Sequence, residues 1–309
     1  MKTPLQVFLS GMLISSAILT ADIDLSDTSS EKITAAEPEK EEAGPISVQV
    51  FFDIVSTTRF DEDCFKSHID YSQAEIDFGL VYYYEPCYEE GLNATAAFNV
   101  TNFKWHDNPF FNQTRYNTLT LTLGGFTRRV VDWRWVAQAG ANLDTTHWDF
   151  EEYTTYDMLL WGRYNYCDNL GVHVGFVARS GMKIDRVLPI LGVDWTFWNC
   201  MQLNLIFPLN VSLAYSWNKN WSAALAGRFF YSRHRVGDDQ HIQKGLWEYQ
   251  NTGAEFAITY LQKGWLSCNV HAGYALGGRV KISDRHHKHS HRFDFEGSPY
   301  AGLNAEVRF

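Results

Sequence analysis

The C-terminal stretch, residues 298–309, constrains the fold more than any other part of this 309-residue chain. Apolar side chains stand at every second position, and small or polar side chains stand between them. The apolar set is Ala301, Leu303, Ala305, Val307 and the terminal Phe309, and the set between is Tyr300, Gly302, Asn304, Glu306 and Arg308. Successive side chains of a β-strand point to opposite faces, so this pattern predicts a strand with one apolar and one polar face.

An alternating last strand that ends on phenylalanine resembles the closing strand of bacterial outer-membrane β-barrels. The resemblance is to an architecture, and it covers the chain from Ile46 to Phe309. It implies an outer-membrane location, contact with outer-membrane lipid, and partnership with the barrel-assembly machinery and periplasmic chaperones. The residues that it assigns to the assembly signal are Tyr300, Leu303, Ala305, Val307 and Phe309.

The N-terminus fits export. Met1-Lys2 is weakly positive, and the mostly apolar stretch from Val7 to Leu19 has the length of a signal-peptide core, which is too short to cross a membrane as a helix. We expect a signal peptide over residues 1–21, cleaved after Ala17 or Ala21. The rest of the sequence holds no apolar run of about 18 residues, and a membrane protein without spanning helices must be a closed barrel.

Residues 22–45 are acidic and have no strand pattern. They contain eight Asp or Glu residues against Lys32 and Lys40. We expect a disordered periplasmic leader here, and a tether or partial plug is the alternative. The net charge of −10 argues against nucleic acid as a partner.

Fourteen alternating segments, separated by turn signals, predict an all-β fold: a transmembrane antiparallel up-and-down barrel over residues 46–309. The segments are 46–55, 74–84, 91–103, 115–127, 130–144, 154–166, 169–180, 187–198, 200–207, 210–217, 220–233, 248–261, 264–282 and 298–309. The connections alternate between short and long, as periplasmic turns and outer loops do. Pro208 interrupts residues 200–217. If these form one bent strand, the count becomes odd and another boundary must be wrong, so twelve strands is the alternative.

Aromatic residues make up 16% of the chain, which fits the girdles at the two membrane interfaces. Trp133, Trp198, Trp217, Trp221 and Trp265 lie near the predicted periplasmic turns. Trp105, Trp148 and Trp247 lie near the predicted outer loops, where we expect the second girdle.

The predicted inward faces carry charges of both signs. The candidate lumen residues are Asp132, Arg134, Arg163, Arg179, Asp194, Arg228, Glu255, Glu306 and Arg308. Opposed charged rows in a water-filled lumen give weak ion selectivity. The pattern therefore favours a small, weakly selective porin for hydrophilic solutes, with a structural or adhesive surface barrel as the alternative.

A barrel enzyme that hydrolyses outer-leaflet lipid or peptide is the third hypothesis. It depends on His106 with Asp107, on His147 with Asp144 and Asp149, and on His234 with Ser232 and Asp238. Such catalysis needs a base within hydrogen-bond reach of its partners, which sequence cannot show. We expect no enzyme activity and no cofactor.

Two further patterns concern metals and disulfides. His286, His287, His289 and His291 fall within one loop and form a candidate metal site, although neighbouring Arg and Lys side chains repel cations. The exported compartment permits disulfides, and Cys64, Cys87, Cys167 and Cys200 are the candidates, within the chain or to envelope proteins. A fifth cysteine, Cys268, leaves an odd number. This cysteine content resembles that of chlamydia-like bacteria, whose envelopes are cross-linked by disulfides.

Overall fold

The computed structural model describes residues 44–61, 67–85, 89–147, 150–198, 200–208, 210–262 and 265–309. Both the predicted signal peptide and nearly all of the acidic leader lie outside these residues. The strands are β1 (Ile46–Arg59), β2 (His68–Glu85), β3 (Glu90–Trp105), β4 (Arg115–Thr127), β5 (Trp133–Asp144), β6 (Thr154–Cys167), β7 (Leu170–Gly181), β8 (Ile184–Phe197), β9 (Met201–Phe207), β10 (Asn210–Ser216), β11 (Trp221–Arg235), β12 (Leu246–Gln262), β13 (Leu266–Ser283), β14 (His291–Phe295) and β15 (Ser298–Arg308). No helix in these ranges is long and apolar enough to cross a membrane.

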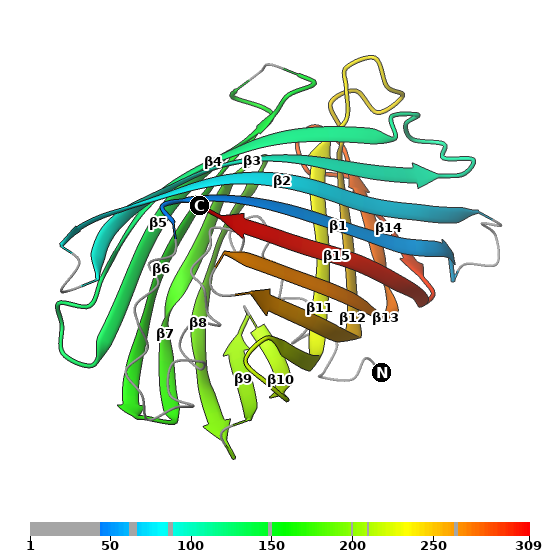
Figure 1. The fold of residues 1–309 in the computed structure, drawn as a ribbon. Coiled ribbons are helices and arrows are strands. Elements are labelled where there is room, and N and C mark those ends of the chain that lie inside the picture. The colour runs from blue at the N-terminus through cyan, green and yellow to red at the C-terminus, as the bar shows by residue number, and fades with distance from the viewer. Residues whose placement is uncertain are drawn as a thin grey trace.

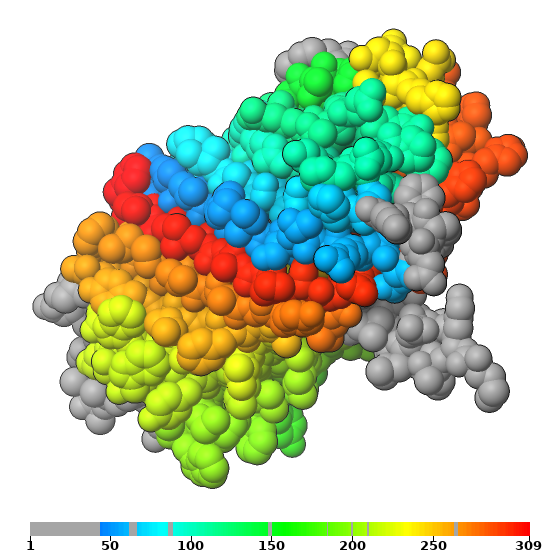
Figure 2. All heavy atoms as spheres, turned by 90° about the vertical axis from the view of Figure 1, so that its right-hand side faces the viewer, coloured from blue at the N-terminus to red at the C-terminus, as the bar shows by residue number. Residues whose placement is uncertain are grey.

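The strands close into a barrel (Figure 1). Each strand pairs antiparallel with its neighbours, and β15 completes the ring by pairing with β1 on one side and β13 on the other. In Figure 2, β15 lies between β1 and β13 on one side of the molecule. The backbones of Ile46, the first residue of β1, and Phe309 exchange hydrogen bonds, from Ile46 N to Phe309 O at 3.1 Å and from Phe309 N to Ile46 O at 2.9 Å.

The barrel has fourteen strands, as the sequence predicts. The short strand β14 pairs with β13 over Gly278–Ile282, just beyond the stretch where β13 pairs with β15. It therefore continues the line of β15, with an interruption at Glu296 and Gly297. Pro208 lies at the tip between two separate strands, β9 and β10, so the twelve-strand alternative is wrong.

Burial alternates along the strands. On β1, Phe52 and Ile54 are 42% and 49% exposed on the outer face, whereas Asp53 and Val55 are 1% and 2% exposed on the inner face. This arrangement confirms the period-two interpretation, because an apolar outer face and a more polar inner face are what a membrane barrel requires.

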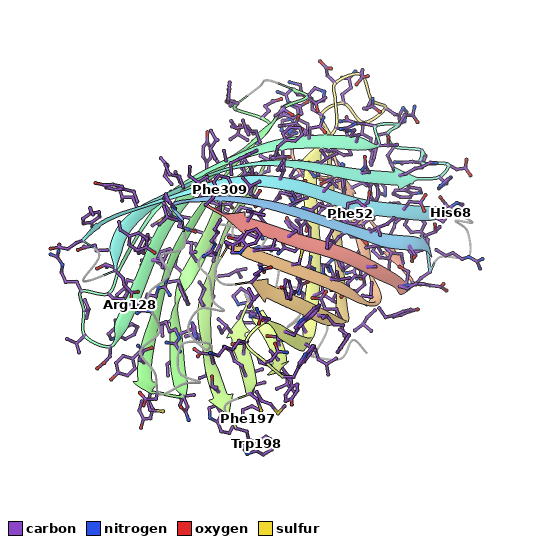
Figure 3. All side chains as sticks on the ribbon, in the orientation of Figure 1. Phe52, His68, Arg128, Phe197, Trp198 and Phe309 are labelled. Carbon is purple, nitrogen blue, oxygen red and sulfur yellow. The ribbon has the colours of Figure 1, made fainter. Side chains whose placement is uncertain are left out.

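We call the end that holds Ile46 and Phe309 the terminal end, and the other the loop end. The outward-facing Trp198, Trp217, Trp221 and Trp265 lie beside the turns of the terminal end and are 42–81% exposed. Figure 3 shows Phe197 and Trp198 at the tip of β8, pointing away from the barrel. These positions fit the predicted girdle.

The loop end differs from prediction. Trp105 and Trp247 are 6% and 0% exposed and belong to the interior, so they form no second girdle; Trp148 lies outside the described residues. Several strands also extend further than predicted. The predicted loop 56–73 is largely taken up by the ends of β1 and β2, and the predicted loop 283–297 contains β14. These extensions carry the side chains that fill the loop end.

Candidate functional site in the lumen

Inward-facing side chains from neighbouring and non-neighbouring strands meet at the loop end. We call this cluster the cross-lumen core; its buried members are Val55, Phe60, Ile69, Tyr71, Phe103, Trp105, Phe111, Tyr116, Phe230, Val236, Trp247, Tyr249, Ala275, Val280, Ile282, Phe293, Phe295 and Tyr300. Phe103 of β3 stacks on Trp247 of β12, with ring centroids 4.4 Å apart. Strands β3 and β12 are not neighbours in the barrel, so the contact fills this part of the lumen with packed aromatic side chains.

The upper halves of β11 and β12 pass inside the neighbouring wall. Arg233, on the outer face of β11, donates from Nη2 to the carbonyl oxygen of Met182 at the β7–β8 turn, at 2.7 Å. Arg235 donates from Nε to the carbonyl oxygen of Glu152, at 2.9 Å. As a result both faces of β11 are covered at this level, and Tyr231 and Ser232, on opposite faces, are each 5% exposed.

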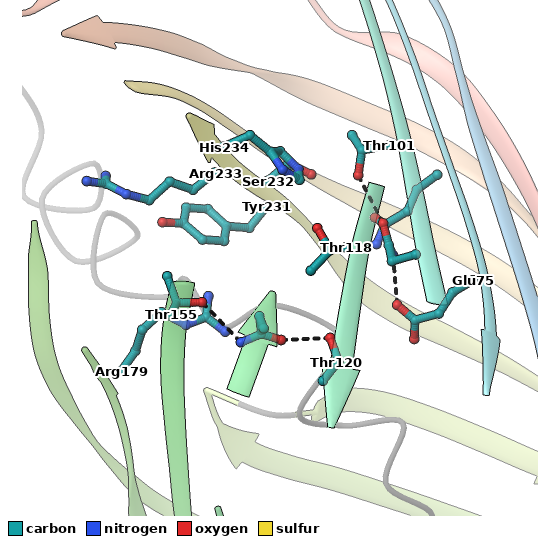
Figure 4. Close-up of a pocket in the computed structure, with 13 residues that line it drawn as sticks. Glu75, Thr101, Thr118, Thr120, Thr155, Arg179, Tyr231, Ser232, Arg233 and His234 are labelled. Carbon is teal, nitrogen blue, oxygen red and sulfur yellow. Dashed lines mark hydrogen bonds between the residues drawn. The ribbon is translucent and has the colours of Figure 1, made fainter. Parts of the chain in front are cut away.

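A polar pocket remains beside the cross-lumen core (Figure 4). It lies between the inner faces of β2–β7 and the upper half of β11. Its lining consists of Gln73, Glu75, Asn99, Thr101, Thr118, Thr120, Asn142, Thr155, Arg179, Tyr231, Ser232, Arg233 and His234. Each of these residues carries a polar group beside its apolar atoms, and amide and hydroxyl groups bind water and hydroxylated solutes by exchanging hydrogen bonds.

The pocket wall is held by hydrogen bonds between side chains of neighbouring strands. Asn99 Nδ2 donates to Glu75 Oε2 at 2.7 Å, and Thr120 Oγ1 donates to Asn142 Oδ1 at 2.8 Å. Asn142 Nδ2 in turn donates to Thr155 Oγ1 at 3.1 Å. The inner wall of β2–β6 is thus a continuous polar surface.

Two ion-pair clusters lie deeper in the lumen, nearer the terminal end. In the first, Arg163 binds Asp194 through two hydrogen bonds of 2.9 and 2.7 Å, and His173 Nε2 lies 2.5 Å from the same carboxylate. Trp161 Nε1 donates to His173 Nδ1 at 3.0 Å. The histidine is therefore held between an indole donor and a carboxylate, with its Nε2 hydrogen pointing at Asp194.

The second cluster lies on the opposite wall. Asp53 accepts from Arg228 Nη2 at 2.5 Å and pairs with His271 Nε2 at 2.7 Å. Gly302 lies between Asp53 and His271 in the strand register. A Cβ at Gly302 would fall on the contacting atoms of both side chains, so glycine leaves the space in which they meet.

The remaining lumen candidates are placed as follows. Arg179 pairs with Asp157 at 2.5 Å, Glu255 accepts from Tyr300 Oη at 3.1 Å, and Arg308 pairs with Glu306 on the same strand. Arg134 lies half-buried on the inner face of β5.

Asp132 does not line the lumen, contrary to the prediction. It is exposed, lies in the turn before β5, and has a φ of 63°. The alternating pattern continues through Asp132 in the sequence, but the strand itself begins at Trp133. Aspartate tolerates this left-handed turn conformation.

The loop end carries a second set of ion pairs in its loops. Glu152 pairs with Lys244 at 2.7 Å and with Arg285, and so joins three connections: β5–β6, β11–β12 and β13–β14. We call this the Glu152 latch. The hydrogen bond from Lys244, and then that from Arg285, lower the pKa of the Glu152 carboxyl below its ordinary value of 4.5.

Three of the four loop histidines have contacts outside the histidine group. His287 contacts Ser283 and Lys281, His289 contacts Asp284 at 3.0 Å, and His291 stacks on Phe110. Across the described part of the chain, no group of three His, Cys, Asp or Glu side chains is placed to hold a metal ion. The predicted metal site at His286, His287, His289 and His291 therefore receives no support from the described residues.

Cys167 and Cys200 are free thiols, as is Cys268, so the structure shows no disulfide among the cysteines that it describes. Cys64 and Cys87 lie outside the described residues. The predicted disulfides therefore receive no support at Cys167 and Cys200.

The residues of the predicted assembly signal lie on β15 and at its end. Leu303 and Phe309 are 41% and 61% exposed, and Ala305 and Val307 share the outer face with Leu303. Tyr300 instead points inward, is 3% exposed and contacts Phe230.

The histidines considered for catalysis occupy separate places. His106 Nε2 lies 3.1 Å from Asp70 and stacks on His68. His147 Nδ1 is 3.7 Å from Asp144. His234 stacks on Tyr116 within the buried interior, while its neighbour Ser232 contacts Tyr71 Oη at 2.6 Å. Neither hydroxyl of that contact is held by a histidine base, as an activated serine would be.

Several lumen residues were missed by the sequence analysis. Asp53, His173 and His271 complete the two ion-pair clusters, and Arg186, Arg233, Glu248 and Arg279 lie at the loop end. The alternation along each strand indicates whether these side chains point into or out of the barrel. Their partners on other strands depend on the register between the strands, which alternation does not determine. The sequence feature that could have indicated these clusters is the pair of inward-facing glycines, Gly171 and Gly302, because each lies beside an ion-pair cluster.

No protein-family model matches this sequence. An uncharacterised protein of Chlamydia pneumoniae is 25% identical over 203 residues, which are 65% of this chain and 63% of that protein. An uncharacterised protein of Chlamydia trachomatis is 22% identical over 201 residues, with the same two coverages. The match thus spans less than two thirds of these relatives. Their source agrees with the chlamydia-like lineage indicated by the cysteines.

Solved outer-membrane channels are also similar. The COG4313 outer membrane channel from Pseudomonas putida F1 matches with a TM-score of 0.47 and 9% identity over 89% of this chain and 100% of that chain. KdgM porin in complex with oligogalacturonate matches with a TM-score of 0.39 and 8% identity, over 85% and 99%. At these values the likeness concerns the barrel architecture alone.

Proposed function

We propose that this protein is a narrow outer-membrane channel for small hydrophilic solutes, with weak selectivity. One observation supports it above the others: polar side chains line the inner wall of β2–β6 continuously, beside an aromatic core that occupies the rest of the loop end. Water and small polar solutes follow hydrogen-bonding surfaces and avoid dry apolar ones.

The charge pattern supports weak rather than strong selectivity. Three inward carboxylates are each paired with an arginine: Asp53 with Arg228, Asp157 with Arg179, and Asp194 with Arg163. Paired charges cancel at distances beyond a few ångströms. A solute therefore meets local dipoles rather than a row of one sign.

The Glu152 latch supports a gated path. It holds the three loops over the pocket end of the lumen through two ion pairs at the surface. Exposed pairs of this kind are weak, of about 0–1 kcal/mol each. Thermal opening of such loops needs little energy, so we expect brief conducting events rather than a steady open level.

The test is single-channel recording of the refolded full-length protein in planar bilayers. Short steps that are small, increase with salt concentration and show a permeability ratio for K⁺ over Cl⁻ near unity are the expected result. A silent bilayer, with folding verified by heat-modifiable migration on gels, would overturn the proposal and favour a structural role. Large, steady steps would instead show that the cross-lumen core is absent in the membrane.

A further inference from the structure

The polar pocket beside the cross-lumen core is small. Its cavity volume is about 60 Å³. A water molecule takes up about 30 Å³ in the liquid, so the pocket has room for two groups of the size of water or of a hydroxyl. Its lining comes from β2–β7 on one side and from the upper half of β11 on the other. A ligand of this pocket therefore places only a small part of itself there.

Two buried side chains of β11 line the pocket with polar groups that other residues leave unbound. Tyr231 and His234 are 5% and 8% exposed, and both belong to the lining. Within the described part of the chain, neither the hydroxyl of Tyr231 nor a ring nitrogen of His234 has a hydrogen-bond partner. A buried polar group without a partner costs free energy, so both groups require a ligand or water in the pocket.

Packing holds the ring of His234 in place. It stacks on Tyr116 with ring centroids 4.9 Å apart and packs against Trp247 at 5.2 Å. From β4, Thr118 adds another hydroxyl that has no hydrogen-bond partner among the described residues (Figure 4). Hydroxyl and neutral imidazole groups both donate and accept hydrogen bonds. The groups that await a ligand are thus suited to hydroxyls, which also donate and accept.

The charged residues of the lining do not favour an ion. Arg179 is bound to Asp157 at 2.5 Å, and Arg233 is bound to Glu248 at 2.6 Å. An anion in the pocket would have to compete with these two carboxylates, and it would also be repelled by Glu75 in the same lining. A cation would be repelled by the two arginines. The pocket is therefore best suited to a ligand without charge.

We propose that the pocket binds two adjacent hydroxyl groups of a neutral polyhydroxylated solute, a polyol or a sugar. Tyr231, His234 and Thr118 supply the hydrogen bonds, and the rest of the solute stays in the lumen. The proposal names the solute class of the proposed channel and rests on that function, because the solute reaches the pocket through the lumen.

The test measures binding of three small probes to the refolded full-length protein in detergent by ligand-detected NMR. Propane-1,2-diol carries adjacent hydroxyls, its isomer propane-1,3-diol carries separated ones, and lactate has a carboxylate in place of one hydroxyl-bearing carbon of the first probe. We expect propane-1,2-diol to bind about three- to tenfold more tightly than either of the others, since only it makes every hydrogen bond without a charge.

Two variants locate the site. Tyr231→Phe removes one oxygen and keeps the ring, and Thr118→Val replaces a hydroxyl by a methyl group. We expect each to weaken binding of propane-1,2-diol about three- to tenfold, the contribution of one hydrogen bond. Tyr300→Phe is the matched control, because Tyr300 is 3% exposed and does not line the pocket; it should bind as the wild type does.

Equal binding of the two diols would mean that the pocket holds water only, and tighter binding of lactate would mean an anion site; either result overturns the proposal. So does a preference for propane-1,2-diol that both pocket variants retain. Conductance is recorded separately on the same preparations. Binding without conductance would refute the channel and leave the pocket as a binding site, whereas conductance without the diol preference would refute this proposal alone.

Discussion

Tyr71 of β2 stacks on Tyr249 of β12 with ring centroids 4.3 Å apart and ring planes at 8°. Three strands of the ring, β1, β15 and β13, separate β2 from β12, so the pair joins strands that are not neighbours in the barrel. The stack belongs to the cross-lumen core, which fills this part of the loop end. In the channel that we propose, the solute path runs along the polar wall beside this core.

The first prediction concerns this stack. Tyr249→Ala removes a fully buried ring from the cross-lumen core and should lower the free energy of unfolding by about 3–5 kcal/mol. It should also increase single-channel conductance several-fold, because the vacated volume lies in the lumen. Urea unfolding followed on gels, and bilayer recording, measure the two effects.

Trp217→Ala is the control for Tyr249→Ala, since Trp217 is 47% exposed on the outer face at the terminal end. It should leave conductance unchanged. Equal conductance of the Tyr249→Ala variant and the wild type would show that the core does not limit the path.

The second prediction concerns acid gating by the Glu152 latch. The pKa of Glu152 is lowered in the folded protein, chiefly by Lys244. The latch is therefore complete above the ordinary carboxyl pKa, and it is lost as the pH falls through the lowered value. Open probability should rise when the solution on the side of the loops is made more acidic than the ordinary carboxyl pKa of 4.5.

Glu152→Gln should show a high open probability at neutral pH and a flatter pH profile. Glu89→Gln offers a matched control, because Glu89 is ion-paired to Arg128 at the opposite end. If the Glu152→Gln channel keeps the acid response of the wild type, another group gates the loops.

The third prediction concerns Gly302. Alanine there places a Cβ on the atoms through which Asp53 and His271 meet, and we expect a loss of about 1–3 kcal/mol of stability from overpacking. Gly227→Ala is the comparison, because its Cβ would find only ordinary contacts at 3.8 Å and beyond. Chemical unfolding measures the stability of the two variants. Similar midpoints would mean that the side chains of the Asp53 cluster shift at no cost in stability when alanine replaces Gly302.

The fourth prediction concerns the terminal residue. Deletion of Phe309 removes two backbone hydrogen bonds to Ile46 as well as the exposed ring, whereas Phe309→Ala removes the ring alone. If the ring is an assembly signal, both variants should insert into membranes more slowly than the wild type. Phe256→Ala, which removes an outward ring from β12 that is 50% exposed, should insert normally. Slow insertion of the deletion variant alone would assign the effect to strand pairing.

The barrel was predictable because its determinants are local. Side-chain alternation places Phe52 outside and Asp53 inside without knowledge of any other strand. A membrane protein without a spanning helix crosses the membrane as a closed β-barrel. The ends of strands were less predictable: Asp132 continues the alternation, yet its backbone has already turned.

The cross-lumen core could not be predicted from alternation. Trp217 and Trp247 both lie near strand ends, and each has a polar residue on its C-terminal side. Trp217 is exposed on the outer surface, whereas Trp247 is wholly buried and stacks on Phe103 of β3. Contacts across the lumen depend on barrel shape, which is a property of all strands together.

The joining of the first strand to the last has a consequence for how the chain folds. The register that pairs Ser47 with Arg308 links residues that are almost the whole barrel apart in sequence, and such distant contacts form late because loop closure must come first. The strand edge of β1 stays open until β15 arrives, and β15 also brings Tyr300 into the cross-lumen core. Pairing of β15 is thus the step that commits the chain, and until then its open strand edges remain exposed to aggregation.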